Sequence, residues 1–95
     1  MFNSLEELVN IIRSRKNSNS EKSYTKKLLD DKNLNFKKVN EEINELIEAI
    51  KKNDNQIHEA ADVLYHLLVL LEGSGIQIED VMKELKKRQN GIRQK

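Results

Sequence analysis

The chain has 95 residues, of which 37% are apolar and 35% are charged, and its formal net charge at pH 7 is +1. This length predicts one small domain. The near-neutral charge gives no reason to expect a nucleic-acid or membrane partner. The absence of cysteine excludes a disulfide scaffold or a thiol catalyst. With two Phe, two Tyr and no Trp, the core is thin for a lone monomer, so we expect an oligomer.

The first half of the chain predicts two short helices separated by a polar loop. Ser4 and Glu7 have the S-x-x-E spacing of a capping box, and apolar residues then recur at helical spacing, so a helix is expected from Ser4. The polar residues 16–22 predict a mobile loop. A short helix is expected over residues 23–31, followed by a break near Asn33, which tolerates a left-handed backbone.

The second half predicts a helical hairpin. Asn35 is expected to cap a long helix that ends near Lys52 and carries its apolar residues on one face. The polar residues 53–55 form a tight turn, and a second long helix is expected over residues 56–72. Two long helices joined by a short turn lie antiparallel.

The C-terminal part predicts one more helix. Gly73 and Gly75 are typical of the end of a helix. Residues 78–89 then show helical spacing, and the side chains expected to face inward are Ile78, Val81, Met82 and Leu85. Residues 90–95 are expected to be a frayed tail. The longest apolar run is far too short to span a membrane, and the N-terminus lacks a signal pattern, so we expect a cytoplasmic location. The fold class is therefore all-α, a single domain over residues 1–95.

Acidic residues gather on the polar side of the first hairpin helix. Glu41, Glu42, Glu45 and Glu48 share a stripe opposite its apolar face. Like charges three or four residues apart on a helix cost a few tenths of a kcal/mol per pair. On this helix alone, a solvated acidic face is the simpler interpretation.

The second hairpin helix changes that interpretation. It carries Glu59 and Asp62 on one face and is apolar almost all round in its second half, so we expect it to be the most buried helix. Carboxylates there need a partner or a cation. When the hairpin folds, the two acidic stripes are expected to face each other across one groove. Oxygen ligands of this kind suit Mg²⁺ or Mn²⁺. The chemistry suggested is therefore metal-assisted attack of water on a phosphorus centre. The alternative is salt bridging between the helices through lysines.

The motif Glu42-x-x-Glu45 followed by Glu59-x-x-Asp62 resembles the all-α nucleoside-triphosphate pyrophosphohydrolases, the MazG-like superfamily. The segment Ser23-Tyr24-Thr25, together with the runs at 38–45 and 59–71, is similar to the phosphoribosyl-ATP pyrophosphohydrolase family of histidine biosynthesis. The likeness covers about residues 4–89.

The resemblance implies Mg²⁺-dependent hydrolysis of phosphoribosyl-ATP to phosphoribosyl-AMP and pyrophosphate by a homodimeric helical bundle. It also implies a set of roles: Mg²⁺ ligands at Glu42, Glu45, Glu59 and Asp62; orientation or deprotonation of water by Glu41; contact with substrate phosphate by Lys38; and substrate binding by Ser23, Tyr24, Thr25 and Lys26.

Simpler interpretations stay open beside these roles. Lys38 fits a solvated charge, and the segment at residues 23–25 fits a helix cap with a packed tyrosine. Tyr65 and His66 are more typical of hydrogen-bonded packing than of chemistry. Two other functions also remain: the same metal chemistry on free (deoxy)nucleoside triphosphates, and a non-catalytic helical interaction module.

Overall fold

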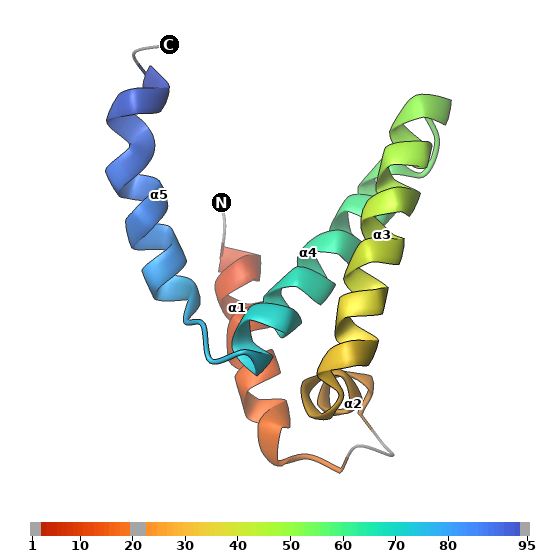
Figure 1. Cartoon of the computed structure of the whole chain (residues 1–95), viewed down its shortest axis with the longest axis vertical. Helices are drawn as coiled ribbons and strands as arrows, with labels where there is room; N and C mark the ends of the chain where they lie inside the picture. Colours follow the sequence, from red (N-terminus) through yellow and green to blue (C-terminus); the bar gives the residue numbers. More distant parts are fainter. Residues whose placement is uncertain (1–2, 20–22, 94–95) are drawn as a thin grey trace.

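The computed structural model describes residues 3–19 and 23–93, with side chains up to residue 89. These residues contain five α-helices, one 3₁₀ turn and no strand, so the all-α class is confirmed. Figure 1 shows two long helices side by side as an antiparallel hairpin, two shorter helices packed near one end, and a last helix that projects away. In chain order the α-helices are α1 (Asn3–Ser14), α2 (Tyr24–Asp30), α3 (Lys32–Lys52), α4 (Gln56–Gly73) and α5 (Ile78–Arg93).

The N-terminal helix differs from the prediction at both ends. Helix α1 already includes Asn3, so Ser4 lies inside the helix and not at its cap. Part of the expected loop is helical, because the turn η1 (Arg15–Asn17) continues the chain from α1. Residues 20–22 lie outside the described residues, so the mobility of the loop stays a prediction.

The junction between α2 and α3 is sharper than expected. Ser23 caps α2 by accepting the backbone N–H of Lys26 at 3.2 Å. Asp31 then caps α3 by accepting the N–H of Leu34 at 3.1 Å, so the predicted cap at Asn35 is wrong. The side chain of Asp31, three residues before the first apolar residue of α3, accepts this otherwise unpaired amide. Helix α3 therefore begins before Asn35, which lies inside the helix and is buried. The break falls at Asp31, and Asn33 is not left-handed.

Positive φ angles mark the two turns around α4. Asn53 and Asn55 have φ of 54° and 58°, which closes the predicted turn between α3 and α4. Gly75 has φ of 76° after α4, where a side chain would be strained. Helix α5 then runs to Arg93, beyond the predicted end at Gln89, so the expected frayed tail is helical as far as Arg93.

The core lies where α1, α2 and α4 meet. Ile12, Leu28 and Val69 are almost fully buried there, and Leu34 from the start of α3 packs against them. Helix α4 contacts α1, α2, α3 and α5, so it is the central element. Glu45, Glu59 and Asp62 come from the other half of the hairpin, nearer to the turn between α3 and α4.

An ion-pair network fastens α1 to α4 and α5. Nε of Arg13 donates to Oε1 of Glu72 at 2.6 Å, and the two terminal nitrogens of Arg13 donate to Glu79 at 2.6 and 3.0 Å. Glu72 is only 5% exposed, so the pair compensates a buried carboxylate. These hydrogen bonds lower the pKa of Glu79 from 4.5 to about 2.

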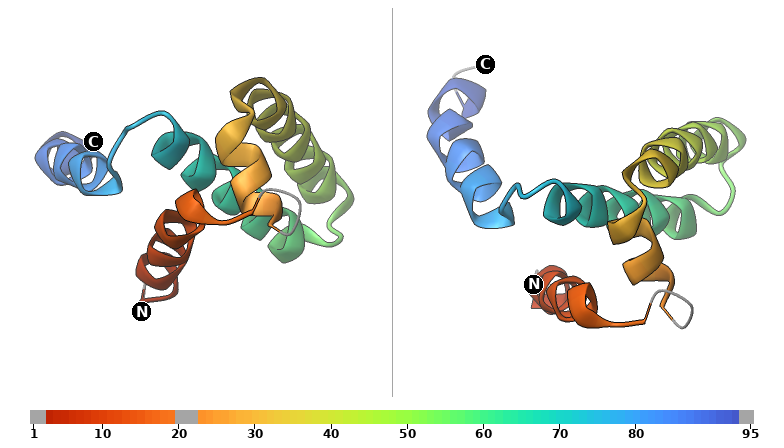
Figure 2. Two further views of the ribbon diagram at one scale, coloured as in Figure 1. Left: turned by 90° about the horizontal axis from the view of Figure 1, so that it is seen from below. Right: turned by 60° about the horizontal axis from the view of Figure 1, so that its bottom comes forward.

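Large apolar side chains remain exposed on α3, α4 and α5. The inward orientation predicted for Met82 and Leu85 is wrong for this chain, because α5 turns away from the bundle (Figure 2) and leaves both half exposed. Helix α4 is likewise central but not fully buried. The exposed set includes Ile43, Ile47 and Ile50 on α3 and Ile57, Leu64 and Leu67 on α4.

No single helix within residues 3–19 and 23–93 is both long and apolar enough to cross a membrane. Helices α4 and α5 pass that test only when taken together, as a pair bent by 112°.

Candidate metal centre and substrate site

Three carboxylates converge across the groove between α3 and α4. Glu42, Glu45 and Glu59 each offer an oxygen, and these atoms lie within 4.8 Å of one another. Glu42 and Glu45 are three residues apart on α3, hence on one face, and the turn at residues 53–55 returns the chain so that Glu59 on α4 meets them. The sequence predicted this convergence from the two E-x-x-E/D spacings.

The electrostatics of this triad disfavour three bare charges. Burial raises the pKa of Glu42 above its ordinary value, and the charges of Glu45 and Asp62 raise it further. Burial likewise raises the pKa of Glu59, with the neighbouring carboxyl of Glu45 as the next cause. The Oε2 atoms of Glu42 and Glu59 are buried without a hydrogen-bond partner among the described residues. Such atoms are suited to a hard cation such as Mg²⁺ or Mn²⁺.

Asp62 belongs to an adjoining group. It clusters with His58 and Glu59, whose ligand atoms also lie within 4.8 Å of one another, so Glu59 is common to both groups. Nε2 of His58 lies 3.3 Å from Oδ2 of Asp62, one helical turn away. His58 was not predicted as part of this site, although its i,i+4 spacing from Asp62 places it on the same face of α4.

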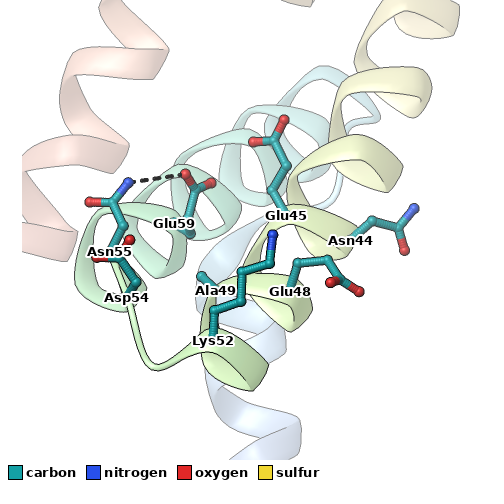
Figure 3. A pocket seen from close by; sticks show the side chains of 8 residues that line it. All are labelled: Asn44, Glu45, Glu48, Ala49, Lys52, Asp54, Asn55 and Glu59. Carbon is teal, nitrogen blue, oxygen red and sulfur yellow. Dashed lines mark hydrogen bonds between the residues drawn. The ribbon is translucent and has the colours of Figure 1, made fainter.

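An open pocket lies between the end of α3 and the start of α4. Figure 3 shows Glu45 and Glu59 lining it from the two helices, with Asn55 bonding weakly to Glu59 at 3.5 Å. Lys52 also extends into this pocket from the last turn of α3. Lys52 was not predicted as a pocket residue, because its spacing on the helix does not distinguish it from the other exposed lysines of α3.

Lys38 and Glu41 form a pair on the first half of α3. The Nζ atom of Lys38 lies 3.5 Å from Oε2 of Glu41, and both side chains are partly exposed. Glu41 precedes Glu42 in sequence but is not a member of either carboxylate group. Both residues lie on α3 within about one turn of Glu42, and their predicted roles stay predictions.

The segment at residues 23–26 lies against α4 beside the triad. Nε2 of His66 lies 2.9 Å from the hydroxyl of Tyr24, and the hydroxyls of Thr25 and Tyr65 are 2.5 Å apart. Lys26 is less available, because its ammonium group donates to Asp30 at 2.8 Å.

Tyr24 is close to the acidic stripe of α3. Burial raises the pKa of Tyr24 above its ordinary value. The charge of Lys38 lowers this pKa, and the charges of Glu42 and Glu41 raise it. The ten residues singled out from the sequence therefore come from α2 with its cap, α3 and α4. They combine a group of carboxylate oxygens suited to a hard cation with hydroxyl and ammonium groups, an arrangement suited to binding a polyphosphate.

Comparison with known proteins gives a consistent picture. A family model described as phosphoribosyl-ATP pyrophosphohydrolase matches residues 5–89. The chain is 42% identical to a phosphoribosyl-ATP pyrophosphatase from Methanococcoides burtonii, over 90% of this chain and 92% of that protein. It is 46% identical to a protein of the same name from Clostridium acetobutylicum, over 93% and 83%. It also matches the histidine biosynthesis bifunctional protein HisIE of Thermotoga maritima at 44% identity, over 86% of this chain and 43% of that protein.

Proposed function

The chain belongs to the phosphoribosyl-ATP pyrophosphohydrolase family, and we propose that its carboxylate triad binds the Mg²⁺ that assists this hydrolysis. The enzyme converts phosphoribosyl-ATP to phosphoribosyl-AMP and pyrophosphate, the second step of histidine biosynthesis. The observation that carries the metal proposal is the convergence of Glu42, Glu45 and Glu59, two of whose buried oxygens have no hydrogen-bond partner in the part of the chain that the structure describes.

The proposed ligands are Glu42, Glu45 and Glu59, with Asp62 reaching the same ion or a neighbouring one. When bound, Mg²⁺ neutralises charge on the phosphates and lowers the pKa of a bound water. The carboxylates fix the position of the cation at the groove, and their own repulsion is relieved when it binds. Mn²⁺ fits the same oxygen ligands.

Lys38 and Glu41 would then act together on the substrate and the attacking water. Their pair is partly exposed, and such pairs contribute only about 0–1 kcal/mol, so exchanging partners costs little. When Lys38 turns to a substrate phosphate, the carboxylate of Glu41 is released to accept a proton from water. On this proposal, the base and the phosphate-binding cation are three residues apart on α3, close enough to pair before substrate binds.

The segment that precedes and begins α2 would hold the substrate beside the metal. Ser23 accepts an N–H through its oxygen, an arrangement that leaves its own proton available to a phosphate oxygen. Thr25 and Lys26 flank the same region. A cytoplasmic location belongs to this proposal and is supported by relatives that are named as enzymes of histidine biosynthesis.

A homodimer is the oligomer that we propose. The single chain exposes a row of apolar side chains at Ile43, Ile47 and Ile50 on α3, spaced to lie on one face. Leu64 and Leu67 on α4 are also exposed. Exposed apolar patches of this kind are typical of interfaces between permanently associated subunits.

Metal binding and turnover can be tested on the same variants. Mn²⁺ binding followed by electron paramagnetic resonance, and pyrophosphate release in Mg²⁺, should both be lost in Glu45→Gln and kept in Glu84→Gln. Glu84 is a matched control, because it is an exposed acid on α5 whose partner among the described residues is Arg88 of the same helix. Wild-type metal affinity and turnover in Glu45→Gln would overturn the metal proposal.

A further inference from the structure

Lys52 is a second cation in the groove between α3 and α4. It belongs to the last turn of α3 and lines the pocket of about 340 Å³ that Glu45 and Glu59 also line. Figure 3 shows its side chain extended within this pocket, in the direction of Glu45. A positive charge therefore lies in the same pocket as two of the three triad carboxylates.

Helical geometry directs this side chain toward the triad. Glu45, Ala49 and Lys52 are spaced by four and three residues, so they share one face of α3. Side chains of an α-helix lean toward its N-terminus, so Lys52 covers the turn that contains Ala49. Ala49 lines the pocket with only a methyl group, which leaves room beside it for a ligand. The ammonium group is thus brought back toward Glu45.

The ammonium group of Lys52 is not engaged by a carboxylate. Within residues 3–19 and 23–89, no ion pair involves Lys52, and the nearby Glu48 pairs instead with Lys51 at 3.6 Å. Both lysines are favoured by the negative end of the helix dipole at the end of α3, so that effect does not distinguish them. Only Lys52 lines the pocket, where it is available to an anion.

The two lysines of the groove lie on opposite sides of the triad. Lys38 precedes Glu42 by about one turn, and its charge lowers the pKa of Tyr24 on α2. Lys52 follows Glu45 by about two turns, next to the turn that joins α3 to α4. A polyphosphate held at the triad therefore meets one lysine on each side of the bond that is hydrolysed.

We propose that Lys52 binds the terminal phosphates of phosphoribosyl-ATP, which leave as pyrophosphate, so that this end of the substrate points to the α3–α4 turn. The inference rests on the proposed function and adds an orientation to it, in which Lys38 meets the phosphate that stays with the nucleoside. The other phosphate of the substrate lies beyond the base and a ribose, too far from the triad to be the partner of Lys52.

The charge of the pocket sets a condition on this binding. Four carboxylates line it beside the single ammonium group, those of Glu45, Glu48, Asp54 and Glu59. Such a pocket repels a free anion, and it accepts one when a divalent cation offsets the charge of the triad. We therefore expect pyrophosphate to bind in the presence of Mg²⁺ and not in its absence.

The two reaction products test the orientation, and isothermal titration calorimetry in saturating Mg²⁺ measures their binding without turnover. Lys52→Met removes the charge and keeps an apolar stem. In this variant Kd for pyrophosphate should rise about tenfold, the effect of one lost charge-assisted hydrogen bond, and Kd for phosphoribosyl-AMP should stay within about twofold. KM for phosphoribosyl-ATP should rise similarly, with kcat little changed, because a contact away from the reacting bond is made equally in the ground and transition states. Lys52→Arg keeps the charge and should retain most of the pyrophosphate affinity.

Lys51→Met is the matched control, because it removes the same charge from the same turn outside the pocket. It should leave both dissociation constants within about twofold of the wild type, since exposed pairs are weak. Wild-type pyrophosphate affinity or an unchanged KM in Lys52→Met, or an equal loss in Lys51→Met, would overturn the inference. Weaker binding of phosphoribosyl-AMP with unchanged binding of pyrophosphate would reverse the orientation and also overturn it. A wild-type protein that binds magnesium pyrophosphate through Lys52 but does not hydrolyse phosphoribosyl-ATP would instead refute the proposed function.

Discussion

Replacing Glu42 by Gln should stabilise the metal-free protein while abolishing its response to Mg²⁺. The carboxylate of Glu42 lies among other carboxylates, and its Oε2 has no hydrogen-bond partner among the described residues. The substitution therefore removes repulsion from Glu45 and Glu59 without breaking a bond seen at that atom. A side chain that destabilises the metal-free protein is typical of a functional site, where it stabilises the protein only when its ligand is bound.

The expected gain in the free energy of unfolding follows from the distance between the carboxylates. Two unit charges at the 4.8 Å limit of the cluster repel by about 3.5 kcal/mol at an effective dielectric constant of about 20, and by about 0.9 kcal/mol in water. Glu42 is partly exposed and Glu45 is exposed, so the lower end applies, about 1 kcal/mol. For a domain of this size that raises Tm by about 4–8 °C. The pKa of Glu42 is raised, so this repulsion grows as pH rises and the gain should vanish in acid, where Glu42 is protonated.

Thermal unfolding at fixed protein concentration, with and without Mg²⁺, measures both effects. Saturation at 100 times Kd should stabilise the wild type by about 2.7 kcal/mol and leave Glu42→Gln almost unchanged. Glu84→Gln on α5 should keep the wild-type response and shift Tm little. A Glu42→Gln variant that is less stable than wild type near pH 7, or that keeps the full response to Mg²⁺, would refute the reasoning.

Three further substitutions extend these expectations. Asp62→Asn should leave circular dichroism unchanged and lower kcat/KM by at least about 100-fold. Asp80→Asn, at an exposed position on α5, is the control and should not change kcat/KM. Full turnover in a folded Asp62→Asn variant would exclude Asp62 as a ligand. The pKa of Glu79 is lowered to about 2 through its hydrogen bonds from Arg13, so its stabilisation is present above about pH 4.5 and lost as pH falls towards 2. Glu79→Gln should therefore flatten the dependence of Tm on pH in that window, and an unchanged profile would argue against the pair. Ile47→Asp should convert the proposed dimer to monomer in sedimentation velocity, and a dimer of wild-type affinity would place the interface elsewhere.

The sequence predicted the helices well and their starting points less well. Helical spacing and the Asn-Asp-Asn turn were sufficient for the α3–α4 hairpin, because both are local signals. The cap of α3 was misplaced, because Asp31 and Asn35 both suit an N-cap and only the packed structure buries Asn35. The outward turn of α5 follows from the backbone after Gly75, which spacing alone does not specify.

The candidate site shows the same division between local and tertiary information. Helical geometry placed Glu42 beside Glu45, and the short turn brought Glu59 to them, so the triad could be expected from spacing. The bond between Tyr24 and His66 joins residues 42 positions apart and depends on how α2 rests on α4, which no periodic pattern encodes. His66 was correctly expected to be a hydrogen-bonded packing residue, but its partners could only be read from the structure.

The most direct test of the account is pyrophosphate release from phosphoribosyl-ATP, measured with and without Mg²⁺ beside a panel of ordinary nucleoside and deoxynucleoside triphosphates. We expect Mg²⁺-dependent release that is selective for phosphoribosyl-ATP and is lost in Glu45→Gln. Release from ordinary triphosphates alone would keep the metal chemistry and contradict the substrate. Release from none of them by a folded protein in Mg²⁺ would contradict the account and leave a helical module without this chemistry.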